Sequence, residues 1–166
     1  MAVALVHSRL DYDNAVLVDI PAYLVRRLQS VLNAVVQLIY HLRPYDHISD
    51  ALATLHWLCI PERVQYKVAV LTYELLLGSA PRYLGPLVAV ADLPDRRALQ
   101  SASTSHLVVS PIKLFAVGSH AFPVAAAQVW NSLPEAIVSL SSLQTFCRHS
   151  KSHLFRLSHP YLIFDC

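Results

Sequence analysis

Charged side chains are scarce in this sequence. Asp, Glu, Lys and Arg make up only 14% of its 166 residues, while hydrophobic residues make up 55% and the mean hydropathy is +0.43. Soluble domains usually carry about 25% charged residues. The length fits one domain, but the apolar excess predicts a neighbouring domain or partner that covers part of its surface. We therefore interpret the chain as a piece of a larger protein.

Uninterrupted apolar runs are also missing: the long uncharged run over residues 114–134 contains Gly118, His120, Pro123, Gln128 and Asn131. A membrane-spanning helix needs about 20 consecutive, mainly apolar residues. Arg27 and His41 bracket the apolar residues 28–40, and Lys67 and Glu74 interrupt a second stretch. We therefore expect no membrane-spanning helix.

Cysteine is too sparse for a disulfide framework. The three cysteines, Cys59, Cys147 and Cys166, are odd in number and widely separated, unlike those of a small secreted domain. The apolar residues 1–6 are few, they lack the positively charged region that begins a signal peptide, and charged residues follow soon after. We therefore expect no signal peptide. These features predict an intracellular protein, in the cytoplasm or nucleus, that is not secreted.

Motifs for phosphate chemistry are absent too. The three glycines are isolated from one another, which excludes a glycine-rich phosphate cradle, and no two aspartates are adjacent. Asp11 and Asp13 form a D-x-D motif that can hold a divalent cation, but no second acidic cluster lies nearby, and two exposed acids give the same pattern. Ser119 and His120 are a nucleophile and a base without the G-x-S-x-G elbow. We therefore expect no catalytic residue and no cofactor.

Nine histidines raise the question of a zinc site. His56 and Cys59 lie three residues apart, and Cys147, His149 and His153 fall within two helical turns. Neither set has the paired spacing that supplies four tetrahedral ligands. Surface or packed histidines explain the pattern as well, so we expect no metal site.

Hydrophobic periodicity predicts two long helices in the N-terminal half, over residues 21–42 and 61–77. Their apolar residues recur at spacings of three and four. In the first helix these positions are Leu24, Leu28, Val31, Val35, Leu38 and Leu42. In the second they are Val64, Val68, Leu71 and Leu75, and Gly78 supplies a stop. We expect the two helices to pack on each other as an antiparallel pair.

The second half gives a weaker pattern. Gly, Pro and polar residues after Pro81 indicate loops. Two short strands are expected at 107–109 and 112–117, and helices at 124–130 and 142–155. The predicted fold is mainly α: a helical bundle over residues 1–90, then a loop-rich middle and C-terminal helices over 91–166.

Five sequence blocks occur in a recognisable order. They are HSRLDYDNAVLVDIPAYLVRRLQSVLNAV (7–35), YDHISDALATLHWLCIPERVQYKVAVLTYELLLGSAPRYL (45–84), RRALQSA (96–102), AFPVAAAQVWNSLP (121–134) and KSHLF (151–155). Together they resemble the blocks that LINE-type, non-LTR retrotransposon reverse transcriptases carry after their polymerase motifs, among them SRLDYCNSLL, LHWLP, R-x-LRSA and LWNSLP.

The resemblance implies a segment downstream of the catalytic domain. In that family the endonuclease and the polymerase, with its metal-binding aspartates, precede this region, so no catalytic residue can be carried over. The implied function is a non-catalytic C-terminal segment that assists template binding. Its partners would be the rest of the polypeptide and RNA or an RNA–DNA hybrid, with no small-molecule substrate. The alternative is a co-opted helical protein-interaction module without a nucleic-acid role.

Six basic residues are the candidates for nucleic-acid contact. Two lie on the long helix, two lie one turn apart on the next, and two lie in a loop, as phosphate-contacting groups often do. They are Arg26, Arg27, Arg63, Lys67, Arg96 and Arg97. A solvated helix face has the same pattern, and a net charge of +2 does not decide between the two.

Departures from the family pattern suggest a truncated or decaying copy. Gln100, His120 and Cys147 stand where the family commonly has arginine, each one base transition away from an arginine codon. Ser150 stands where an apolar residue would complete the last helix. An unpaired hydroxyl there forfeits roughly 1–3 kcal/mol.

Two tryptophans lie in the most family-specific blocks. Trp57 belongs to LHWL and Trp130 to WNSLP. A large aromatic residue in such a block more often anchors a core than stacks on a base. We therefore expect both to be largely buried.

Overall fold

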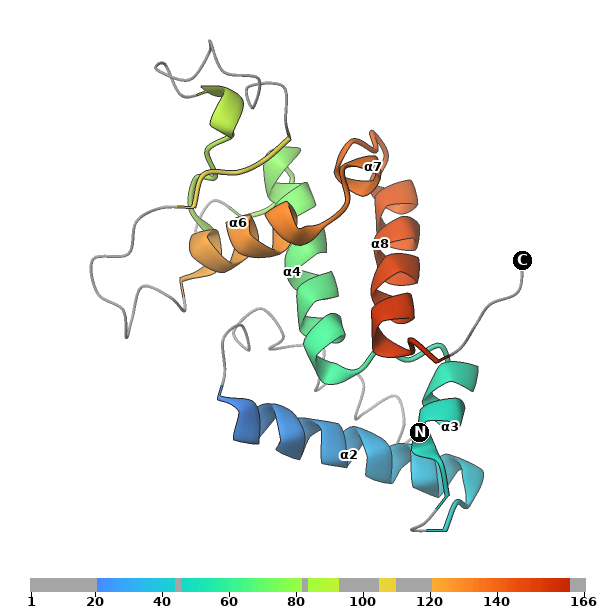
Figure 1. The fold of residues 1–166 in the computed structure, drawn as a ribbon. Helices are drawn as coiled ribbons and strands as arrows, with labels where there is room; N and C mark the ends of the chain where they lie inside the picture. Colours follow the sequence, from blue (N-terminus) through green and yellow to red (C-terminus); the bar gives the residue numbers. More distant parts are fainter. Residues whose placement is uncertain (1–20, 44–45, 82–83, 93–104, 110–120, 162–166) are drawn as a thin grey trace. The chain divides into compact units, whose positions relative to one another are not determined.

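The computed structural model describes residues 21–43, 46–81, 84–92, 105–109 and 121–161. In order, these residues form α2 (Ala22–Tyr40), α3 (Ile48–Thr54), α4 (Ile60–Leu76), the 3-10 helix η2 (Val90–Asp92), α6 (Phe122–Ser132), α7 (Glu135–Val138) and α8 (Leu143–Ser158) (Figure 1). The predicted mainly α fold is confirmed.

The strand expected at 107–109 does not form. Leu107 makes only an isolated antiparallel bridge to Ala89. The Leu107 backbone instead forms two hydrogen bonds with the Asn131 side chain. This side chain accepts from the Leu107 N–H and donates to the Leu107 carbonyl, both at 2.9 Å. The strand expected at 112–117 lies outside the described residues.

The residues group into two units. The first joins the chain up to Val64 with the residues from Lys151 onward, and the second runs from Gln65 to Ser150. Helices α4 and α8 each contribute residues to both units. This grouping differs from the sequence-based division into 1–90 and 91–166, because contacts between residues far apart in the chain define the first unit.

The core of the first unit forms between α2, α3 and the start of α4. Leu32 and Val36 of α2 are fully buried, and they pack with Ala51 and Leu52 of α3 and with Ile60. Helix α2 ends at His41, which adopts a left-handed conformation with φ 50° and donates its N–H to the Gln37 carbonyl.

The buried stripe of α2 differs in part from the expected one, although Leu28 and Leu42 of the expected stripe pack against the core of the first unit. The expected stripe included Val31 and Leu38, but these side chains are 48% and 73% exposed. The buried stripe instead runs through Leu32 and Val36, one position further along the helix. Because α2 is apolar on adjacent faces, two neighbouring stripes both satisfy the spacing of a helix.

The expected antiparallel packing of α2 on the length of α4 stays a prediction, because the two helices fall largely in different units. In the first unit α2 packs on α3 and on the first residues of α4, Ile60 and Val64. The rest of α4 belongs to the second unit. Within this unit the short helix α3 supplies apolar surface that packs on α2.

Three aromatic side chains organise the core of the second unit. The Tyr73 and Phe146 rings stack with centroids 4.4 Å apart, and the Trp130 ring lies 5.7 Å from Phe146. The Tyr73 hydroxyl donates to the Leu140 carbonyl at 2.8 Å, and Trp130 Nε1 donates to the Ser105 carbonyl at 2.8 Å. The polar atoms of both rings are thus satisfied, as buried Tyr and Trp require.

The two tryptophans differ in burial. Trp130 is 3% exposed, which confirms the prediction for this residue. Trp57 is half-buried and packs against the core of the first unit, so it is less buried than expected. Gly78 follows the end of α4 with φ +72° and fulfils its predicted role as a stop.

Ser150 is the exception in the packing of α8. Its side chain is 0% exposed, and its hydroxyl has no hydrogen-bond partner. The buried hydroxyl of Thr72 on α4, by contrast, donates to the Val68 carbonyl at 2.7 Å. The sequence-based expectation of an unpaired hydroxyl at an apolar position is confirmed.

We predict that Ser150→Ala raises the free energy of unfolding by roughly 1–3 kcal/mol, because it removes an unpaired buried hydroxyl and leaves a better helix former. Urea unfolding followed by circular dichroism measures the change. Thr72→Val is the matched control and should give no comparable gain, since its hydroxyl is already bonded. A Ser150→Ala variant less stable than the parent would contradict the prediction.

Candidate functional site

The six basic residues have different environments. Arg26 and Arg27 are exposed on α2, in the first unit. Arg63, in the first turns of α4, is only 8% exposed. Lys67 is half-buried and belongs to the second unit, and Arg96 and Arg97 lie outside the described residues. Among the described candidates, only Arg26 and Arg27 present their guanidinium groups openly to solvent.

The helix that carries Arg26 and Arg27 has no acidic residue. No Asp or Glu occurs from residue 21 to residue 43. Within the described part of the chain, neither guanidinium makes a hydrogen bond or ion pair. Both side chains are exposed to solvent. Arg63, in contrast, is buried and has an interaction of its own, so we do not assign it to a phosphate.

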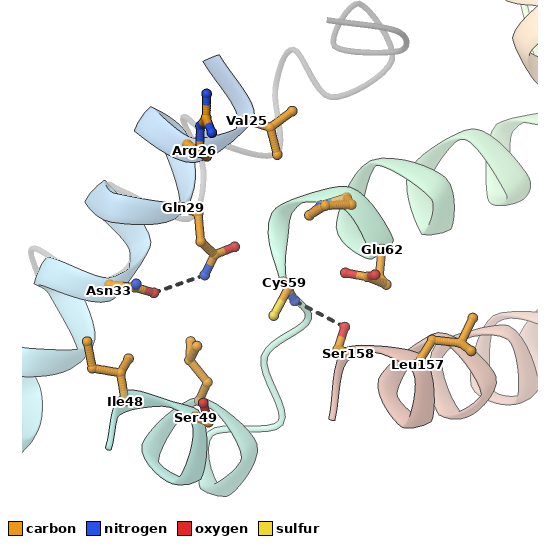
Figure 2. A pocket seen from close by; sticks show the side chains of 12 residues that line it. Val25, Arg26, Gln29, Asn33, Ile48, Ser49, Cys59, Glu62, Leu157 and Ser158 are labelled. Carbon is orange, nitrogen blue, oxygen red and sulfur yellow. Dashed lines mark hydrogen bonds between the residues drawn. The ribbon is translucent and has the colours of Figure 1, made fainter. Parts of the chain in front are cut away.

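A groove of about 400 Å³ lies beside Arg26 (Figure 2). All its walls come from the first unit: α2, α3, the start of α4 and the end of α8. Apolar side chains such as Val25, Ile48 and Leu52 alternate in its lining with polar ones, including Asn33 and Glu62. Its volume falls in the range of ligand pockets, but the groove is largely open to solvent.

The backbone N–H groups at the start of α4 form hydrogen bonds with polar side chains of the groove. The first N–H groups of a helix have no partner within the helix, and two side chains distant in sequence satisfy them here. The Cys59 N–H donates to Ser158 Oγ at 3.2 Å, and the Ile60 N–H donates to Gln29 Oε1 at 2.9 Å. Gln29 Nε2 in turn donates to Asn33 Oδ1 at 2.9 Å (Figure 2).

The end of α8 also holds the connection between α3 and α4. His159 Nε2 donates to the Trp57 carbonyl at 3.0 Å, because a carbonyl can only accept. The His56 ring, in a left-handed residue with φ 54°, stacks on Phe155 at a centroid distance of 5.7 Å. The residues in these contacts are close in sequence to Cys59, Leu157 and Ser158, which line the groove.

The Cys59 thiol in the groove is a poor nucleophile. Burial raises its pKa, and the neighbouring Glu62 carboxylate raises it further, while a hydrogen bond with Ser158 acts in the opposite direction. A raised pKa leaves less of the reactive thiolate at neutral pH. The site therefore lacks an activated thiol.

The second motif considered for zinc, Cys147, His149 and His153, is divided between the units. Cys147 belongs to the second unit, where it lies beside Tyr66 of α4. Burial raises the pKa of Tyr66 to about 12, with Cys147 adding to the shift. His149 belongs to the same unit, whereas His153 is grouped with the first. No cluster of three His, Cys, Asp or Glu that could hold a metal occurs among the described residues.

The remaining motifs lie beyond the described ranges. Asp11, Asp13, Ser119 and His120 all fall in residues that the structure does not describe. Among the helices that it does describe, none is long and apolar enough to cross a membrane.

Comparisons with known proteins leave the family undecided. No protein-family model, curated protein or solved structure matches this chain. The resemblance to the LINE-type reverse transcriptase tail therefore stays a prediction that rests on the sequence blocks alone.

The groove itself was not expected from the sequence. One signal for it is present: Gln29 and Asn33 are polar residues four apart on a mainly apolar helix, a spacing that places both on one face. Glu62 and Ser158 carry no such signal, because they reach the groove from distant parts of the chain.

We predict that Glu62→Gln speeds alkylation of Cys59 by iodoacetamide about threefold at pH 8, because removing the carboxylate lowers the thiol pKa and raises its thiolate fraction. The rate is measured in a Cys147→Ser, Cys166→Ser background, so that a single thiol reacts. Glu74→Gln, later on α4 and not on the groove, is the control and should leave the rate unchanged. An equal or slower rate in Glu62→Gln would show that the carboxylate does not act on this thiol.

Proposed function

We propose that this chain is a non-catalytic C-terminal segment of a LINE-type reverse transcriptase that assists binding of an RNA or RNA–DNA template. The family assignment rests on the ordered sequence blocks. The observation that supports the binding role is the exposed pair Arg26 and Arg27, which has no partner among the described residues and lies on a helix without acidic residues. Catalysis, in this proposal, belongs to another part of the polypeptide.

The chemistry of two neighbouring guanidinium groups favours phosphate. Arginine donates in a planar fork that matches phosphate oxygens. Contacts to the backbone carry no sequence information, so binding through Arg26 and Arg27 is indifferent to sequence and falls steeply with salt. With so few cations, the expected affinity is micromolar or weaker.

We also propose that the chain is a truncated or decaying copy. The fully buried, unpaired hydroxyl of Ser150 supports this, because it costs stability at a position where an apolar side chain would pack. The proposal is consistent with arginine-to-Gln, His or Cys replacements elsewhere in the family-like blocks.

We predict that the double variant Arg26→Ala, Arg27→Ala weakens binding to a labelled RNA–DNA hybrid about tenfold and lowers the slope of log affinity against log salt by about 2, one for each lost phosphate contact. Fluorescence anisotropy at several salt concentrations measures both effects.

The matched control is Lys151→Ala, Arg156→Ala, which removes two exposed charges from α8 in the same unit. It should change binding much less. Tight binding that ignores salt and the α2 substitutions, or an equal loss in both double variants, would exclude a specific role for the α2 pair.

The alternative, a co-opted helical protein-interaction module, has one observation in its favour. Val31 and Leu38 of α2 are 48% and 73% exposed and follow the same helix as the arginines. Exposed apolar stripes of this kind often mark a surface that another protein covers.

We predict that Val31→Ser, Leu38→Ser reduces concentration-dependent self-association and dye binding to exposed apolar surface, while the free energy of unfolding changes by less than about 1 kcal/mol, since both side chains are already solvated. Analytical ultracentrifugation and urea unfolding test the two parts. Val36→Ser, at a fully buried position of the same helix, should instead destabilise the fold. Unchanged association in the double variant would remove the support for this alternative.

A further inference from the structure

The orientation of the Asn33 amide in the groove follows from a chain of hydrogen bonds. The Ile60 backbone N–H can only donate, so the Gln29 atom that faces it is the acceptor Oε1. The Gln29 nitrogen is thereby directed to Asn33 and donates to Oδ1. The Asn33 amide nitrogen is then left as a donor, without a partner in the described part of the chain.

Glu62 gives the groove an acceptor. Its side chain lies on the start of α4, across the groove from α2 (Figure 2). Among the described residues its carboxylate makes no hydrogen bond or ion pair. The groove therefore presents an unused donor and an unused acceptor between apolar walls that include Val25 and Leu52.

The charge of Glu62 also restricts what can enter. A phosphate in the groove would lie against a carboxylate, and like charges at close range repel. Arg26 also lines the groove and is exposed, and Arg27, the next residue of the same helix, is exposed but does not line it. Phosphates therefore favour the exposed Arg26 and Arg27, and a neutral group with both donors and acceptors favours the part of the groove beside Glu62.

We propose that the groove binds one unpaired nucleobase of a single-stranded nucleic acid, with the flanking phosphates on Arg26 and Arg27. This inference rests on the proposed function and adds a preference for single strands. Every base carries adjacent donors and acceptors on its pairing edge, and single-stranded RNA is typically recognised through such splayed bases. In a duplex the same edge is occupied by the complementary strand, so a paired base cannot use the groove.

The experiment compares three labelled ligands by fluorescence anisotropy with the full chain: a short single-stranded RNA, an RNA–DNA hybrid, and a strand of the same length lacking its bases. Wild-type protein should bind the RNA roughly fivefold more tightly than the strand without bases. Asn33→Ala should remove that difference and leave hybrid binding unchanged. Gln37→Ala, which removes an amide one turn further along α2 and outside the groove, should leave both ligands unaffected.

The outcomes separate this inference from the proposed function. Loss of all binding in Arg26→Ala, Arg27→Ala, with no effect of Asn33→Ala, would support the phosphate contacts and overturn the base site. Equal losses for single strand and hybrid in Asn33→Ala would point to a structural role for the amide and also overturn it. A base-dependent effect of Asn33→Ala without an effect of the arginine pair would retain the groove and reject the phosphate contacts. Failure of wild-type protein to bind single-stranded RNA would reject the base site outright.

The stability of each variant is the control: its unfolding in urea must match that of wild type. Asn33→Ser provides a second, smaller polar replacement if Asn33→Ala is unstable.

Discussion

The first unit depends on how the start of α4 satisfies its backbone. The N–H groups of Cys59 and Ile60 need acceptors from outside the helix, and Pro61, the next residue, has no N–H to offer. Ser158 and Gln29 supply those acceptors. One side chain from α2 and one from the end of α8 are thereby brought to the same helix terminus, and the groove is the space that their arrangement encloses.

The low charge content has a visible consequence in α2. A helix with apolar residues on adjacent faces can bury only the face that meets α3 and α4, so Val31 and Leu38 stay in solvent. The same helix carries Arg26, Arg27, Gln29 and Asn33. Exposed apolar, cationic and amide-lined surfaces thus lie side by side on one element, which makes α2 the centre of both the template-binding proposal and its protein-interaction alternative.

The two units differ in how their polar groups are used. In the second unit the side chains of Tyr73, Trp130 and Asn131 all form hydrogen bonds with backbone groups. Ser150 is the buried group left without a partner there. In the first unit the Asn33 amide nitrogen and the Glu62 carboxylate lie beside a groove and have no partner among the described residues. This contrast is why the functional proposals concern the first unit.

The sequence by itself determined the helical class, the approximate helix positions, the stop at Gly78, the burial of Trp130 and the misfit of Ser150. These features follow from local periodicity, backbone preference and side-chain chemistry. The tertiary structure alone decided which stripe of α2 is buried, that Arg63 is covered, that Trp57 is only half-buried, and that Gln29, Glu62 and Ser158 share a groove. Periodicity cannot choose between two apolar faces of one helix, since that choice depends on the neighbour. The partners that settle it, α3 and the residues after Lys151, are brought there by contacts that no local pattern encodes.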